Sequence, residues 1–342
     1  MNVAVVLFNL GGPDKLDSVE PFLFNLFNDP AILNLPSFLR YPLAKLISKR
    51  RAPTAKAIYK EIGGSSPIVK LTRDQAASLE QSLNMNEKGL NYKVFIAMRC
   101  WHPRASETIQ LVKKFNPEEI ILLPLYPQYS AATSGSSILE WQDVAKKNNL
   151  NISTSTICCY PQDEKFVKAH SELIKKNING LKNFKLIFSA HGLPEKNIKK
   201  GDPYQWQVEQ SVNKIMNEMN QDNIDYILSY QSRVGPLKWI GPSTDEVIID
   251  NSKKGKNIIV VPIAFVSEHS ETLVELDIEY KKLAKDNGCK NYIRVEALGI
   301  NKYFIESLSD LILNKDNYKF NNNLYPPIKR CPSNFIKCPC LN

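Results

Sequence analysis

His191 and Glu271 are the two residues of this sequence whose types and surroundings point most directly to chemistry. Each follows a short apolar run, at residues 184–190 and 257–265. An imidazole that faces a carboxylate can bind a divalent metal ion or move protons. We expect the two side chains to come from opposite lobes, to meet across a cleft, and to do both.

Further acids surround Glu271. Glu268, Glu271, Glu275 and Glu279 are spaced by three, four and four residues, so they share one face if residues 270–287 form a helix. Like charges at this spacing repel each other, which argues against a purely structural role for the four acids. A helix face exposed to solvent is the simpler alternative. The stripe predicts a path for metal ions in or for protons out. His269 lies among these acids, and we expect it to support the site.

Composition narrows the class of protein. The chain has 342 residues, 43% hydrophobic and 23% charged, with no apolar tract near the roughly 20 residues that span a membrane. No basic leader precedes the strand-like start, so we expect a cytoplasmic protein. The net charge of +9 suits an anionic partner. Without a zinc finger, an RNA-binding signature or a long basic arm, we expect no nucleic acid partner.

Short apolar runs alternate with amphipathic stretches, which is typical of α/β proteins with parallel sheets covered on both faces. We expect two doubly wound, Rossmann-like domains that flank a cleft, over residues 1–150 and 151–300, followed by a tail over 315–342. A further helix is expected at 302–314, and whether it completes the first domain is left open. The expected strands cover residues 2–10, 93–99, 119–126, 154–159, 184–190, 226–230, 257–265 and 292–297, and the expected helices 104–115, 134–148, 163–178, 203–219, 270–287 and 302–314.

Glycine, aromatic and polar residues gather just after the expected strands. They follow residues 10, 99, 126, 190, 230 and 265. Ligands of open α/β sheets bind at the carboxyl ends of the strands, so this distribution predicts a ligand site there. Residues 21–47, rich in Phe, Leu, Ile and Pro, predict either a pair of core helices or an amphipathic lip that touches a membrane or an apolar ligand.

Eight short motifs stand in order along the chain: Gly11-Gly-Pro13, Lys49-Arg-Arg-Ala-Pro53, Ile62-Gly-Gly-Ser-Ser-Pro-Ile68, Tyr126-Pro-Gln-Tyr-Ser130, Ser189-Ala-His-Gly-Leu-Pro194, Gly201-Asp-Pro-Tyr204, Gln231-Ser-Arg-Val-Gly-Pro236 and Glu275-Leu-Asp-Ile-Glu-Tyr280. Together these motifs are similar to those of the ferrochelatase family. That family inserts ferrous iron into a porphyrin to make haem, and its fold has two Rossmann-like domains beside a cleft. The stretch at 231–246 resembles members that use protoporphyrin IX rather than coproporphyrin.

The resemblance implies roles for individual residues. His191 and Glu271 would bind or hand over Fe(II), and one of them would accept pyrrole protons; which does which stays open. Glu268 and Glu275 would belong to the path for iron or protons. The positions that would bind the porphyrin are Leu10, Tyr59, Trp239 and Phe265 for the ring, Arg50, Arg51 and Ser66 for its propionates, and Arg99 as an arginine of the cleft. Cys100 stands where animal members have a tyrosine, and we assign it no role.

Seven cysteines in a cytoplasmic chain predict thiols or metal ligands rather than disulfides. Cys331, Cys338 and Cys340 are spaced C-x6-C-x-C, and three thiolates need a fourth ligand to hold zinc or a [2Fe–2S] cluster. Some bacterial members of the family carry such a cluster on a similar tail. That resemblance implies Cys158 or Cys159 as the fourth ligand, with Cys158 preferred, and a reduced tail without metal is the alternative.

Two other functions remain open. A chelatase that loads another tetrapyrrole, with cobalt or with coproporphyrin and iron, would share the fold and a histidine-based site. A non-catalytic porphyrin or haem carrier would need the aromatic slot but not the acids beside His191. Porphyrin and ferrous iron are the expected partners, no nucleotide cofactor is expected, and peripheral contact with the inner membrane and the oligomeric state are left open.

Overall fold

The computed structural model describes residues 1–86, 89–221, 223–233, 235–315, 319–320 and 331–341. The chain divides into two compact units. Unit 1 consists of Met1–Cys159 and Leu308–Arg330, and unit 2 of Tyr160–Ser307 and Cys331–Asn342. Among the described residues, no helix is both long enough and apolar enough to span a bilayer.

Unit 1 is built on a sheet with the strand order β2-β1-β3-β4-β9, in which the first four strands are parallel and β9 is antiparallel. β1 is an interior strand in which all residues but those at its ends are apolar, and it pairs with β2 on one side and β3 on the other. The strands are β1 (Asn2–Asn9), β2 (Asn91–Met98), β3 (Glu119–Pro124), β4 (Ser153–Ile157) and β9 (Lys319–Phe320).

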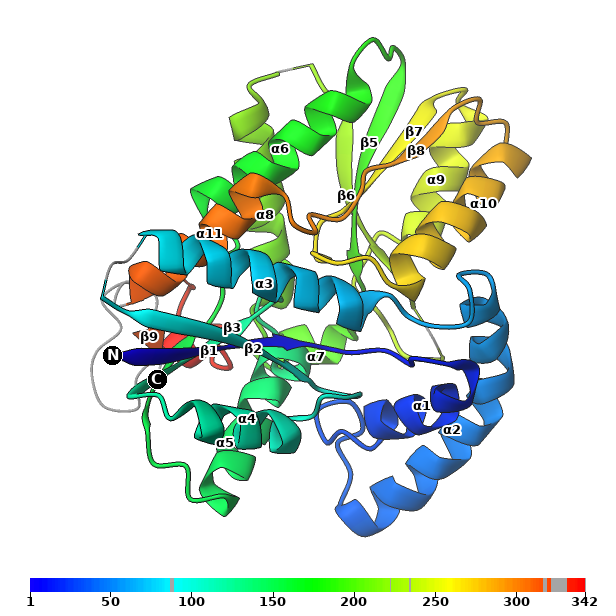
Figure 1. The fold of residues 1–342 in the computed structure, drawn as a ribbon. Helices are drawn as coiled ribbons and strands as arrows, with labels where there is room; N and C mark the ends of the chain where they lie inside the picture. The colour runs from blue at the N-terminus through cyan, green and yellow to red at the C-terminus, as the bar shows by residue number, and fades with distance from the viewer. Residues whose placement is uncertain (87–88, 222, 234, 316–318, 321–330, 342) are drawn as a thin grey trace. The chain divides into compact units, whose positions relative to one another are not determined.

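Helices cover both faces of the first sheet, with α3 on one face and α4 and α5 on the other (Figure 1). Alternate side chains of β1 point to the α4 and α5 side, where the ring of Phe8 lies edge-on to that of Trp141, 5.9 Å between centroids. The helices of this unit are η1 (Leu16–Ser18), α1 (Val19–Phe27), α2 (Ser37–Lys60), α3 (Ile68–Asn86), α4 (Ala105–Phe115), the π-helix η2 (Ala131–Gly135) and α5 (Ser136–Lys147).

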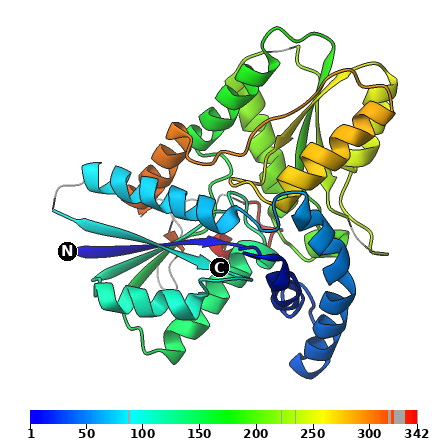
Figure 2. The ribbon, with the colours of Figure 1, turned by 45° about the vertical axis from the view of Figure 1, so that its right-hand side comes forward.

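Unit 2 has a second parallel sheet with the strand order β6-β5-β7-β8. Its helices also lie on both faces, α6 and α8 on one and α9 and α10 on the other (Figure 2). The strands are β5 (Phe184–His191), β6 (Tyr226–Gln231), β7 (Asn257–Pro262) and β8 (Tyr292–Arg294). The helices are α6 (Glu164–Ile178), α7 (Glu195–Lys199), α8 (Tyr204–Met219), α9 (Thr244–Lys253), the π-helix η3 (Glu271–Glu279), α10 (Tyr280–Asp286) and η5 (Pro339–Leu341), and α11 (Lys302–Leu313) begins in this unit and ends in unit 1.

The predicted α/β class is confirmed, and every predicted strand and helix is present with ends that differ by at most three residues. The first sheet runs past residue 150, because β4 pairs with β3. Residues 21–47 do form parts of two helices, but the expectation that both are core helices is wrong. On α2 the side chains of Phe38, Leu39 and Leu46 are exposed, Phe38 by 73%. The expected helix at 270–287 opens as a π-helix instead of an α-helix.

Candidate functional site

His191 and Glu271 meet where the second sheet changes direction. From β5 the chain passes to β6 on one side, and it later returns to β7 on the other side of β5. Connections leave in opposite directions at such a point, which opens a crevice at the carboxyl ends of the strands. His191 is the last residue of β5, and Glu271 opens η3 after the loop that follows β7. The Nδ1 atom of His191 lies 2.8 Å from Oε2 of Glu271.

The expectation that this pair meets from opposite lobes is wrong. Both residues belong to unit 2, and β5 and β7 are hydrogen-bonded neighbours in one sheet. The sequence contains the two strands but not their order, and the order is what brings their ends together.

The Glu271 carboxylate stabilises a positive charge on the imidazole of His191. Burial alone would lower the pKa of His191, but the charge of Glu271, the hydrogen bond to it and the charge of Glu275 together raise that pKa above its ordinary value. Burial would raise the pKa of Glu271, but His191 and His269 hold it well below its usual range. Nδ1–H of His191 therefore donates to the carboxylate. Its Nε2 atom has no protein partner among the described residues, and 41% of the side chain is exposed.

A second acid continues from this pair through Ser232. The Ser232 hydroxyl lies 2.5 Å from Oε2 of Glu275 and 3.1 Å from Oε2 of Glu271, so its one proton can be shared between the two carboxylates. The Ser232 backbone N–H and the Tyr280 hydroxyl donate to the other oxygen of Glu275, at 2.9 and 3.0 Å. Burial and the charge of Glu271 nevertheless raise the pKa of Glu275. Neighbouring carboxyls thus have pKa values shifted in opposite directions, as groups that divide acid and base roles often do.

The acidic stripe is shorter than the sequence suggests. Glu268 precedes η3, and its Oε1 atom accepts hydrogen bonds from Arg294 Nη1 at 2.5 Å and from Ala297 N at 2.9 Å. Glu279, at the far end of η3, is exposed. The structure therefore brings Glu271 and Glu275 together and engages Glu268 elsewhere.

Aromatic side chains flank the pair within unit 2. The rings of Phe265 and His269 are 4.7 Å apart, and Nε2 of His269 is 3.8 Å from Oε1 of Glu271. A Cβ atom on Gly192 would lie only 3.3 Å from the ring of Trp239, so the glycine lets that ring pack beside the backbone that follows His191. The Trp239 indole N–H is buried and has no hydrogen-bond acceptor in the described part of the chain.

The predicted ring-binding residues of unit 1 also lie together. Leu10, the residue after β1, and Tyr59 on α2 pack in one apolar cluster with residues of α1 and the buried Cys100. Burial raises the pKa of the Cys100 thiol to about 12, so it stays protonated, in keeping with the absence of an assigned role. A Cβ atom on Gly12 would lie 2.5 Å from Ser66 Cβ and Oγ, which explains why the Gly-Gly turn admits no side chain there.

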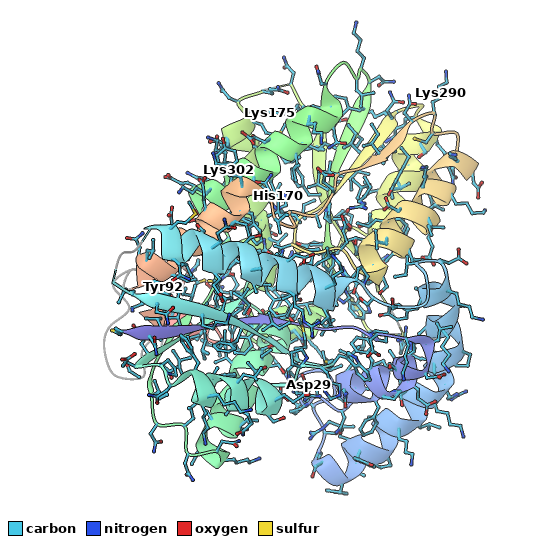
Figure 3. The ribbon with its side chains drawn as sticks, in the orientation of Figure 1. Asp29, Tyr92, His170, Lys175, Lys290 and Lys302 are labelled. Atoms are coloured by element: carbon cyan, nitrogen blue, oxygen red, sulfur yellow. The ribbon has the colours of Figure 1, made fainter. Side chains whose placement is uncertain are left out.

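The predicted arginines of the porphyrin site differ in availability. Arg50 and Arg51 are exposed on α2, and the guanidinium of Arg51 lies 5.7 Å from the ring centroid of Phe27. Arg99 is instead 13% exposed and pairs with Asp29 at 3.0 Å and Glu140 at 3.2 Å; Figure 3 labels Asp29. Its guanidinium is thus already neutralised by carboxylates of unit 1.

The tail cysteines fold into unit 2 rather than remaining exposed. Cys331, Cys338 and Cys340 are all buried, and the Sγ atoms of Cys338 and Cys340 are within 4.8 Å of each other. The Gln207 amide on α8 donates to Cys331 Sγ at 3.2 Å. Cys158 and Cys159 are buried at the end of unit 1, and none of the seven cysteines, all of which are described, forms a disulfide.

Sequence reasoning gave no role to Ser232, Tyr280 and Arg294, which bind the acids in and beside η3. Ser232 and Tyr280 lie inside motifs that were noticed, but a hydroxyl gives no signal until its acceptor is known. A backbone signal was present only in the structure: Ser232 has φ +60°, a left-handed conformation that points to a constrained position.

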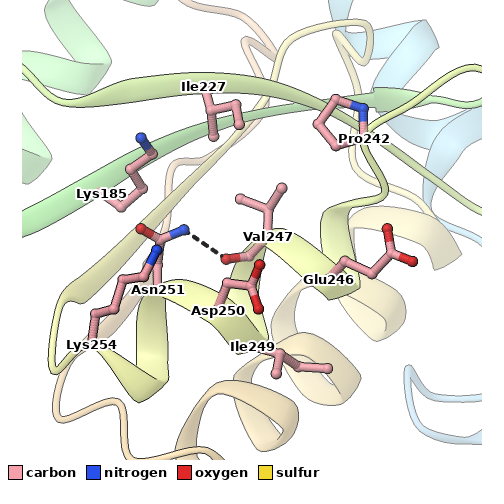
Figure 4. A pocket seen from close by; sticks show the side chains of 9 residues that line it. All are labelled: Lys185, Ile227, Pro242, Glu246, Val247, Ile249, Asp250, Asn251 and Lys254. Atoms are coloured by element: carbon pink, nitrogen blue, oxygen red, sulfur yellow. Dashed lines mark hydrogen bonds between the residues drawn. The ribbon is translucent and has the colours of Figure 1, made fainter.

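A surface cavity of about 530 Å³ lies elsewhere in unit 2, between α9 and the edge of the sheet (Figure 4). Ile227, Val247 and Lys254 are among its lining residues, and the Asn251 amide closes part of it by donating to Val247 O at 2.8 Å. None of the predicted site residues lines this cavity.

Two α/β units with parallel sheets, one of which carries a histidine–glutamate pair at its switch point, define a chelatase-type fold. The solved structure of SirB from Bacillus subtilis with Fe3+ supports this class, with a TM-score of 0.56 at 14% identity over 94% of this chain and 100% of that chain. A model of the ferrochelatase family matches residues 2–316, and the chain belongs to that family. Curated ferrochelatases are similar over the full length: that of Pelagibacter ubique (strain HTCC1062) is 71% identical over 100% of this chain and 99% of its own, and that of Rickettsia bellii (strain OSU 85-389) is 49% identical over 99% and 95%.

Proposed function

We propose that this protein inserts Fe(II) into protoporphyrin IX, releases two protons, and uses His191 as the group that accepts the pyrrole protons. Membership of the ferrochelatase family supports the reaction class. The observation that supports the role of His191 is its hydrogen bond to Glu271, 2.8 Å long, which leaves Nε2 as a lone pair on a partly exposed ring. A general base needs both an available lone pair and a partner that stabilises the cation formed.

Each of the two pyrrole protons would go first to Nε2 of His191. The imidazolium so formed is stabilised by the Glu271 carboxylate, whose lowered pKa keeps it ionised. Glu275, with a raised pKa and a link through Ser232, is suited to take a proton onward. The two acids also supply carboxylate oxygens that attract the ferrous substrate, which imidazole and carboxylate ligands suit. We therefore assign proton acceptance to His191 and attraction of iron to Glu271 and Glu275.

We propose that Leu10 and Tyr59 in unit 1 and Trp239 and Phe265 in unit 2 contact the macrocycle. Their packing in apolar surroundings within each unit supports this assignment. Arg50, Arg51 and Ser66 would bind the propionates, since guanidinium pairs with carboxylate in two-point geometry. Arg99 would have a structural role in unit 1, because its guanidinium is already paired with Asp29 and Glu140.

Anaerobic turnover tests the proposal. Fe(II) should quench protoporphyrin fluorescence catalytically, with Co(II) and coproporphyrin as slower alternatives, and His191→Ala should nearly abolish the reaction at unchanged porphyrin binding. Faster turnover of coproporphyrin would assign the chain to that branch of chelatases. Stoichiometric binding without turnover would instead indicate a carrier.

We propose that Cys331, Cys338 and Cys340 hold a [2Fe–2S] cluster together with Cys158. Burial of the three tail thiols and the closeness of two of them support a soft-metal site. Such a cluster would supply structural cross-linking of the tail, and no step of iron insertion is derived from it. Anaerobically purified protein should show visible absorbance and two labile sulfides, which Cys158→Ser should remove and the neighbouring Cys159→Ser should not. Equal loss in both variants would withdraw Cys158.

We also propose that α2 contacts an anionic membrane surface from the cytoplasmic side. Phe38, Leu39 and Leu46 are exposed on a helix that also bears Lys49 and Arg50. Apolar side chains beside cations favour the interface of anionic lipids. Vesicles with phosphatidylserine should sediment the protein, and Leu39→Ser should weaken this, whereas Leu139→Ser, on α5, should not. Equal sedimentation of all three proteins would refute it.

A further inference from the structure

Arg294, on the short edge strand β8, joins two acids that lie on either side of the catalytic pair of glutamates. Its Nη1 atom donates to Glu268 Oε1 at 2.5 Å. Its Nε and Nη2 atoms form a two-point contact with the Asp277 carboxylate, at 3.0 and 2.6 Å. The Arg294 side chain is 9% exposed, so these bonds are shielded from water.

Glu268 and Asp277, the two acids that Arg294 binds, flank Glu271 and Glu275 in the sequence. Glu268 precedes Glu271 by three residues, and Asp277 follows Glu275 by two. One rigid, planar guanidinium therefore holds both ends of the segment that carries the two carboxylates. Arg294 is itself fixed in the sheet, because β8 pairs with β7 and Val260 lies opposite Arg294 in the register.

This segment needs an external restraint for two reasons. It is a π-helix, a rare geometry that usually occurs only as a short bulge, and its wide turns are closed by bonds such as Tyr280 N–H to Glu275 O. It also holds the carboxylates of Glu271 and Glu275 close enough to share one hydroxyl, although like charges at this spacing repel. Without a clamp, the segment could relax by separating them.

We propose that Arg294 is a positioning residue: by binding Glu268 and Asp277 it fixes the spacing of Glu271 and Glu275 relative to His191. This inference rests on the proposed function. The proposal also gives Glu268 a structural role, as a partner of Arg294, in place of the expected role in a path for iron. Displacement of reacting groups by about 1 Å can cost about 100-fold in rate, so loss of the clamp should lower kcat by 10-fold or more.

A competing explanation is that Arg294 only neutralises its acids. One oxygen of Glu268, Oε2, is buried and has no partner among the described residues, so removal of the arginine would leave an uncompensated charge. Arg294→Gln alone would then lower stability, and activity would fall merely because less protein is folded. The experiment must separate stability from spacing.

Four proteins separate these explanations. Arg294→Gln removes the clamp and the charge. Arg294→Lys retains the charge, but a single ammonium cannot reproduce the fork that joins two carboxylates. The triple variant Arg294→Gln, Glu268→Gln, Asp277→Asn removes the buried charges together with the clamp. Lys256→Gln is the matched control, because it breaks the ion pair with Asp225 just before β7, at the opposite end of the same sheet.

Turnover per folded molecule, porphyrin KM and the melting temperature are measured for each protein. We expect Arg294→Lys and the triple variant to have melting temperatures close to that of wild type. Their kcat should nevertheless be lower, by at least 10-fold in Arg294→Lys and at least 5-fold in the triple variant. Their porphyrin KM should stay within twofold of wild type. Lys256→Gln should keep its kcat. Recovery of kcat together with stability in the triple variant, or wild-type kcat in Arg294→Lys, would overturn the clamp. If wild type itself failed to insert iron, the proposed function would fail instead.

Discussion

Replacement of Glu271 by Gln tests whether the histidine–glutamate pair is catalytic or structural. The bond from His191 to Glu271 is charge-assisted, but its side chains are 41% and 24% exposed, so we take about 1 kcal/mol of stability for it. The same substitution removes the repulsion between Glu271 and Glu275, which should stabilise the folded protein by about 0.5 kcal/mol. These effects oppose each other, and the melting temperature should move by only about 2–4 °C.

The rate should respond far more strongly than the stability. Gln keeps the shape of the side chain but cannot hold the imidazolium as an ion pair or attract Fe(II), and a lost proton-transfer arrangement costs about 10²–10⁴-fold. The pKa of His191 should also fall, because the charge of Glu271 and the hydrogen bond to it are what raise that pKa against burial. The pH at which the ring becomes neutral should therefore move down.

Two measurements check this prediction. Anaerobic turnover gives kcat, and NMR titration of the imidazole nitrogens follows the four histidines, with His191→Gln used to assign the resonance. Turnover within tenfold of wild type, or a pKa of His191 that does not fall in Glu271→Gln, would refute the assigned pairing. A loss of rate accompanied by wholesale unfolding would show that the pair is mainly structural.

Three further predictions concern other parts of the molecule. Arg51→Ala should raise the porphyrin KM several-fold with little change in kcat, whereas Arg73→Ala on α3 should alter neither; a fall in kcat alone would make Arg51 structural. Gly12→Ala should lower the free energy of unfolding by about 1–3 kcal/mol, because its Cβ would overlap Ser66, and adding Ser66→Gly should restore it; no rescue would place the strain elsewhere. His170 is buried on α6 (Figure 3), and burial lowers its pKa to about 3. As the pH falls below about 6.5 the unfolded chain takes up a proton that the folded chain refuses, which costs about 2 kcal/mol at pH 5. In urea titrations, the free energy of unfolding of His170→Leu should fall less between pH 7 and pH 5 than that of wild type. An equal fall in both proteins would refute this role of His170.

Local sequence patterns predicted eight strands and six helices because these are short apolar runs and amphipathic stretches, but they did not predict α3, α7, α9 or β9. The class of fold followed from their alternation, and His191 and Glu271 were identifiable because each follows a buried strand. The order of strands was not predictable, since it depends on packing between elements far apart in the chain. That order is why the pair joins the carboxyl ends of β5 and β7 within one sheet instead of bridging two lobes.

Side-chain partners were the other limit of the sequence. Arg99 and Glu268 carry the charges that a porphyrin or iron site would use, yet the structure pairs Arg99 with Asp29 and Glu140, and Glu268 with Arg294. Charge and spacing alone could not distinguish Arg99 from Arg51, or Glu268 from Glu275. The members of each pair differ in their neighbouring side chains, which the sequence does not give.

The spacing of four residues between Glu271 and Glu275 suits an α-helix as well as the π-helix that this segment forms. In an α-helix a residue four positions on is rotated by about 40° beyond a full turn, whereas a wider π-turn leaves it slightly short of one. Either geometry places Glu271 and Glu275 on one side, so the spacing itself does not choose between them. Side-chain contacts also hold this segment: Ser232 and Tyr280 bind Glu275, and Arg294 binds Asp277 two residues later. If the wide turn depends on these contacts, then loss of Arg294 should narrow η3, and the separation of the Glu271 and Glu275 carboxylates should change before the fold of unit 2 does.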